Sequence, residues 1–136
     1  MIQTATNNLE QYYETVQSQG KILTAKQAKL WSKAVLSTMG MDMSRGVKKE
    51  LAKALPAELA EQLTRLFWLL HFRNTNVKAA EFQQIVARRS GHSDQHFARV
   101  PITAVFHALK QLITDDLSNK VADDLSPELR DIWQNA

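Results

Sequence analysis

The sequence contains no cysteine, which excludes disulfide bonds, thiolate zinc sites and cysteine nucleophiles. Only four glycines and three prolines occur in 136 residues, too few for the many tight turns of an all-β fold. The longest uninterrupted apolar run, residues 66–70, is far shorter than the roughly 20 residues that a membrane-spanning helix needs. The first residues carry neither a basic start nor an apolar stretch. We therefore expect no secretory signal, no membrane span and a cytoplasmic location.

The overall composition is that of an ordinary globular protein, with 44% hydrophobic and 23% charged residues. Apolar residues recur at steps of three and four almost throughout, which is the spacing of one face of an α-helix. The length suits one hydrophobic core. The sequence therefore predicts an all-α protein in which residues 1–136 form a single compact domain of about seven to eight helices.

Capping residues and breakers predict where the first helices begin and end. Gly20 should end the first helix. Thr24 and Gln27 form a capping box for the second, which should end near Gly40. Asp42 or Ser44 is expected to cap the third helix. Pro56 should occupy the first position of a fourth helix, over residues 56–70, which is apolar enough to be the most buried element.

The second half shows a similar order of signals. We expect Gly91 to end the fifth helix and Ser93 or Asp94 to cap the sixth. Pro101 should kink or split that sixth helix, because proline lacks the amide hydrogen that a helix interior uses. Two further junctions complete the chain: Asp115 or Asp116 as the cap of the seventh helix, and Ser126-Pro127 at the start of the last.

A shift of 70 residues aligns the two halves without gaps. Over residues 28–59 it produces seven identities in 32 positions, where residue usage alone predicts about two. The identical pairs are Ala28/Ala98, Ala34/Ala104, Val35/Val105, Ala52/Ala122, Leu55/Leu125, Glu58/Glu128 and Leu59/Leu129. We therefore expect two diverged tandem units in a pseudo-symmetric arrangement, residues 5–66 and 75–136, joined by a linker at 73–77. Leu55 and Leu125 should be buried at equivalent helix junctions.

Several core and junction motifs resemble those of a known family. They are Phe82 with Val86, Ala104-Val105-Phe106 with Leu109, residues 51–59 (Leu-Ala-Lys-Ala-Leu-Pro-Ala-Glu-Leu) and residues 128–133 (Glu-Leu-Arg-Asp-Ile-Trp). With these motifs the chain resembles the bacterial family catalogued as domain of unknown function 2267. The resemblance implies an all-α fold and carries no established activity, so it supplies no functional residues.

Charge is distributed unevenly along the chain. Residues 21–53 hold eight basic against two acidic side chains, a local charge of +6, and residues 115–131 hold six acidic against two basic ones, a local charge of −4. The candidate partner-binding residues are the basic Lys26, Lys29, Lys33, Arg45, Lys48, Lys49 and Lys53, and the acidic Asp115, Asp116, Asp123 and Asp124. Under the 70-residue shift Arg45 aligns with Asp115 and Lys53 with Asp123, so equivalent positions carry opposite charges.

Opposite charges on helical faces favour association with another protein or with copies of the same chain. Our first interpretation is therefore a non-catalytic helical interaction module. The alternative is a nucleic-acid-associated domain in which Lys26, Lys29, Lys33, Lys48, Lys49 and Lys53 contact phosphates. An enzyme is the third interpretation. A solvated charged face without a partner is the simplest explanation of the basic residues.

No enzyme motif, metal site or cofactor site is expected. The sequence has no glycine-rich phosphate loop, no G-x-S-x-G turn and no H-E-x-x-H motif. His92 and His96 have a metal-compatible spacing but lack an evident third ligand. The paired aspartates fall at expected helix junctions, where acidic side chains favour the start of the following helix.

Overall fold

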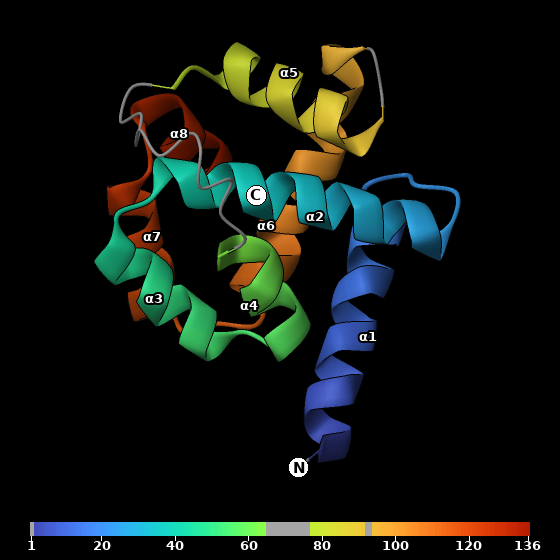
Figure 1. Ribbon diagram of the computed structural model, residues 1–136, viewed down its shortest axis with the longest axis vertical. Helices are drawn as coiled ribbons and strands as arrows, with labels where there is room; N and C mark the ends of the chain where they lie inside the picture. The colour runs from blue at the N-terminus through green and yellow to red at the C-terminus, as the bar shows by residue number, and fades with distance from the viewer. Residues whose placement is uncertain (1, 65–76, 92–93) are drawn as a thin grey trace.

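The computed structural model describes residues 2–64, 77–91 and 94–136 (Figure 1). Within these residues the chain forms eight α-helices and one short 3-10 helix, with no β-strand. They are α1 (Ile2–Gln19), α2 (Ala25–Asp42), α3 (Arg45–Ala54), α4 (Ala57–Thr64), α5 (Ala79–Ser90), η1 (Gln95–Ala98), α6 (Arg99–Lys110), α7 (Asp115–Asp124) and α8 (Pro127–Asn135). The predicted fold class and helix number are confirmed. Most of the expected linker, residues 73–76, lies outside the described residues.

Helix α2 lies at the centre of the molecule. In Figure 1 it runs across the middle of the view, and it packs against α1, α4, α5 and α6. Eleven of its 18 residues are buried, whereas α4 buries Leu59 and Leu63. The expectation that the fourth helix is the most buried element is thus wrong for its described part, residues 57–64. Residues 65–70 of that expected helix lie outside the described range.

The second helix ends near Gly40, as predicted, because its last residue is Asp42. Gly40 lies where α2 meets α4. A Cβ atom on residue 40 would overlap the carbonyl oxygen of Leu63. This glycine therefore allows two helices to approach closely and does not end one of them.

The other two glycines expected at helix ends do lie there. The amide of Gly20, just after α1, donates to the Val16 carbonyl at 2.9 Å, although the residue with left-handed backbone is Lys21, with φ of 54°. Gly91 follows α5 with φ of 90°, and its amide caps the helix. Both predicted ends are confirmed.

The helix starts in the first half agree in part with the predicted caps. Thr24 caps α2, since its hydroxyl accepts from the amide of Gln27 at 3.1 Å. Ser44 is the N-cap residue of α3, whereas Asp42 still belongs to α2. Pro56 precedes α4 instead of opening it, and its carbonyl oxygen accepts the first amide bonds of that helix.

The second half contains one misassigned cap. Thr114 caps α7 by accepting from the amide of Leu117 at 3.2 Å, and Asp115 and Asp116 follow in the first turn. Their carboxylates there still suit the positive end of the helix. The last helix begins as predicted, with Ser126 as the N-cap and Pro127 as the first residue.

Pro101 has the predicted effect on the sixth helix. The corresponding stretch is divided into η1, capped by Asp94, and α6, which begins at Arg99. Pro101 is the third residue of α6, where an amide hydrogen has no partner inside the helix. Because a new helix begins at Arg99, Pro101 lies in the first turn of α6 and not in a helix interior.

Helices from the two halves of the chain pack across each other. Helix α1 lies against α6, α5 lies against α2, and α3 lies beside α7. Phe106 links this core, with ring centroids 6.1 Å from Phe82 and 5.2 Å from Trp133. Leu55 and Leu125 are both buried, as expected for the helix junctions. No helix of the described residues is long and apolar enough to cross a membrane.

Candidate interaction surfaces

The three lysines of α2 line a shallow groove. Lys26, Lys29 and Lys33 are exposed and follow one face of the helix. Across a groove of about 400 Å³, α4 presents Glu58, Glu61 and Gln62. The groove therefore has a basic wall and an acidic wall.

A chain of hydrogen bonds connects α1, α2 and α4, and it includes Glu58 and Gln62, which line this groove. The Tyr12 hydroxyl lies 2.7 Å from Ser32 Oγ, which donates to Gln62 Oε1 at 2.9 Å. Gln62 Nε2 then donates to the Tyr13 hydroxyl at 3.0 Å, and that hydroxyl donates to Glu58 Oε2. The Glu58 carboxylate therefore accepts a hydrogen bond that positions the Tyr13 phenol.

Burial raises the pKa of both phenols well above the usual value near 10. For Tyr12 the hydrogen bond with Ser32 offsets part of this rise in pKa, and for Tyr13 the bond to Glu58 adds to it. The Lys29 ammonium lies 5.4 Å from the centre of the Tyr13 ring. This lysine is thus partly engaged by a cation–π contact.

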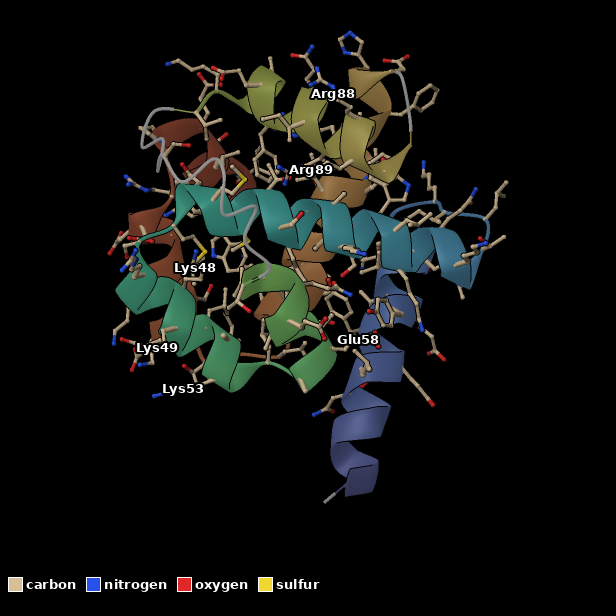
Figure 2. All side chains as sticks on the ribbon, in the orientation of Figure 1. Lys48, Lys49, Lys53, Glu58, Arg88 and Arg89 are labelled. Atoms are coloured by element: carbon tan, nitrogen blue, oxygen red, sulfur yellow. The ribbon has the colours of Figure 1, made fainter. Side chains whose placement is uncertain are left out.

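The basic residues of α3 divide into an inward and an outward set. Lys48 is half-buried and donates from Nζ to the Gly40 carbonyl at 3.2 Å. Burial, with a contribution from the positive charge of Arg45, lowers the pKa of Lys48. Arg45, Lys49 and Lys53 are exposed. Figure 2 shows Lys48 directed toward α2, and Lys49 and Lys53 directed outward.

The aspartates of α7 divide in the same way. Asp124 is half-buried, and its Oδ2 accepts from the Ser44 amide at the start of α3 at 2.6 Å. Asp115, Asp116 and Asp123 are exposed. Asp124 therefore has a structural task in joining two helices, and the other three carboxylates face solvent.

Helices α3 and α7 lie side by side and antiparallel. Residue 44 at the start of α3 meets residue 124 at the end of α7, and Glu50 pairs with Lys120 near their middles at 3.2 Å. The basic helix and the acidic helix thus share one face of the molecule. Glu50 and Lys120, which oppose the prevailing charge of their own helices, are paired with each other.

The structure does not bring the basic residues of α2 and α3 into one continuous strip. Helix α4 packs against both helices, and its Glu58 and Glu61 face the α2 lysines. The sequence interpretation missed these two glutamates, because their place opposite the lysines depends on tertiary packing.

Arg89 of α5 is a further polar contact that the sequence does not reveal. Its guanidinium donates to Ser37 Oγ at 3.2 Å, to Thr38 Oγ1 at 3.0 Å and to Met41 Sδ at 3.3 Å, which fastens α5 to α2. Burial lowers the pKa of this guanidinium. Its contacts are structural, and no sequence motif marks them.

Among the described residues, no group of three or more histidines, aspartates or glutamates is arranged to hold a metal ion. Of the histidine pair with metal-compatible spacing, His92 lies outside the described residues and His96 is exposed.

The family comparison matches nearly the whole chain, over residues 9–132, to a family described as "Uncharacterized conserved protein (DUF2267)". The chain belongs to the DUF2267 family. The resemblance inferred from the core and junction motifs is thereby confirmed. A comparison with curated proteins found no match. Membership in the DUF2267 family assigns no activity, so the surfaces described above must carry the functional argument.

Proposed function

We propose that this DUF2267 protein is a non-catalytic interaction module that binds another protein, or a second copy of itself, through oppositely charged helical faces. The observation that carries the proposal is the antiparallel pairing of basic α3 with acidic α7 on one face. Exposed charges of both signs steer protein association and select partners. A face that presents both signs suits a protein surface with the complementary pattern.

We also propose that the chain consists of two tandem units in a pseudo-symmetric arrangement. The helix boundaries support this: α3 spans residues 45–54 and α7 spans 115–124, a displacement of 70 residues. The same displacement relates the starts of α2 and η1, and of α4 and α8. The first helix of each unit packs on the second helix of the other unit, since α1 lies on α6 and α5 on α2. Duplication followed by divergence accounts for opposite charges at equivalent positions.

The interaction proposal is tested by affinity capture from an extract of the native cells. The variants are Lys49→Glu with Lys53→Glu, and Asp116→Lys with Asp123→Lys. We expect the unmodified protein to capture a partner protein from the extract that neither variant captures. The control is Arg88→Glu, an exposed reversal on α5 that Figure 2 shows well apart from Lys49 and Lys53. If the two charge-reversed variants captured as much partner protein as the unmodified chain, α3 and α7 would be excluded as the binding surface.

A nucleic-acid-associated domain is the second candidate. It is favoured by the exposure of the six basic residues Lys26, Lys29, Lys33, Arg45, Lys49 and Lys53. Against it, α4 places two glutamates beside the α2 lysines, and α7 places aspartates beside α3. These carboxylates weaken the attraction of either helix for a polyanion.

Fluorescence anisotropy with duplex and single-stranded oligonucleotides separates the two candidates. A phosphate-binding protein loses affinity steeply as salt rises, because each neutralised phosphate releases counterions. At about 0.15 M salt we expect weak binding or none. Sub-micromolar, salt-sensitive binding that is lost on changing Lys26, Lys29 and Lys33 to Glu would favour the nucleic-acid function instead.

A further inference from the structure

We infer that a second copy of this chain docks on the face formed by α3 and α7, with α3 of each copy lying over α7 of the other. This inference rests on the proposed function and names the partner. The two copies are related by a two-fold axis that runs along the two helices. The same surface is then used on both copies, and the contact closes at two chains.

The outward sides of the two helices carry opposite charges. On α3, Lys49 and Lys53 are four residues apart and share one side of the helix. On α7, Asp116 and Asp123 are seven residues apart and also share one side. All four side chains are exposed, and none of them forms an ion pair with another described residue of the chain. Their charges are therefore available to a partner.

The direction of the axis follows from the charges. An axis across the helices would place α3 over α3 and α7 over α7, so that like charges meet. An axis along the helices places basic α3 over acidic α7 twice. Since like charges that face each other across an interface are unfavourable, the second arrangement is favoured.

The antiparallel register determines which residues meet. Residue 44 lies level with residue 124, and residue 50 with residue 120. Because both helices rise by the same step per residue, Lys53 lies level with Asp116 and Arg45 with Asp123. A two-fold axis along the helices preserves these levels, so Lys53 faces Asp116 and Arg45 faces Asp123 of the other copy. Lys49 lies level with residue 120, at a height between these two aspartates. Glu50 and Lys120 remain paired at the centre.

The composition of the face sets the character of the contact. Among the described residues, the large apolar side chains with high exposure are Leu23, Leu30, Phe97 and Val100, and none belongs to α3 or α7. The contact therefore depends on charge. It should weaken as salt screens the charges.

Two charge-reversed variants test the arrangement when they are mixed. Lys49→Glu with Lys53→Glu makes both helices acidic, and Asp116→Lys with Asp123→Lys makes both helices basic. We expect each variant alone to lose self-association by about tenfold or more, because the two-fold axis applies every reversal twice. An equimolar mixture should recover it, since acidic helices of one variant then face basic helices of the other. Sedimentation velocity would measure the mass in each sample.

Several outcomes would overturn the inference: self-association of either variant at the strength of the unmodified chain, failure of the mixture to associate, or growth of the unmodified chain beyond two copies. The last result would indicate a head-to-tail contact. A circular dichroism spectrum that matches that of the unmodified protein shows that a variant is folded. If the unmodified chain is monomeric but still captures a protein through the same four residues, the inference fails and the proposed function stands.

Discussion

Two glycines, Gly40 in α2 and Gly46 in α3, have opposite surroundings. At position 40 a Cβ atom would overlap the Leu63 carbonyl, and at position 46 it would meet no other atom within 4 Å. The same residue type thus marks a close helix contact in one place and an open helix surface in the other. The sequence alone could not separate these roles, because the close contact at Gly40 depends on how α4 packs against α2.

The pair gives a matched test of helix packing. Gly40→Ala should destabilise the protein by about 1–3 kcal/mol, because α2 and α4 must move apart to accommodate the methyl group. Gly46→Ala should stabilise it by about 0.5 kcal/mol, because alanine loses less backbone freedom on forming a helix. Urea unfolding measures both. Equal effects from the two substitutions would contradict the close approach of α2 to α4.

The buried phenols of Tyr12 and Tyr13 predict a loss of stability in alkali. Both have a pKa raised by burial, so in the range above about pH 10 the unfolded chain loses these protons before the folded chain does. Their contribution to the free energy of unfolding is complete below about pH 10 and declines as the pH rises above it. Between about pH 9 and pH 11 the unmodified protein should lose about 1 kcal/mol more than Tyr12→Phe. Urea unfolding at both values measures the difference, and an identical pH dependence would exclude a buried Tyr12.

At the scale of elements, most helix boundaries could be predicted because their signals are local. Thr24, Gly91 and Ser126-Pro127 act through their own backbone and nearest turn, so the sequence contains the necessary information. Where several adjacent residues can cap a helix, the local signal does not select one of them. Thr114 precedes two aspartates, and threonine and aspartate are both good N-cap residues.

The contacts between elements could not be predicted in the same way. Asp123 and Asp124 look equivalent in the sequence, yet only the second accepts a hydrogen bond from the start of α3. Glu58 and Glu61 face the α2 lysines because α4 packs against α2. These relationships depend on how the helices cross, which the spacing of apolar residues along one helix does not specify.

The two aspartates allow that difference to be measured. Asp124→Ala should destabilise the protein by about 1–2 kcal/mol, because the Ser44 amide loses a charged acceptor. Asp123→Ala should change stability by less than about 0.5 kcal/mol, as is usual for an exposed side chain. Thermal or urea unfolding of both variants provides the comparison. If Asp123 proved the more costly loss, the assignment of structural and partner-binding roles on α7 would have to be reversed.

At the scale of the whole molecule, the net charge of +3 conceals a separation of charge that the fold places on one face. Basic α3 and acidic α7 are distant in the sequence and adjacent in space. The sequence predicted the two charged segments, but their adjacency emerged only from the structure. That adjacency makes a face complementary to itself and an unfavourable surface for a polyanion.

The most direct test of this central claim is the mass of the unmodified protein in solution, measured by sedimentation velocity over a range of concentrations at low and high salt. At low salt, about 0.05 M, we expect the mass to rise with concentration to that of two chains and no further. At about 0.5 M salt, where the charges are screened, we expect the mass of one chain. A single chain under every condition, or association that strengthens with salt as an apolar contact would, would contradict association through opposite charges.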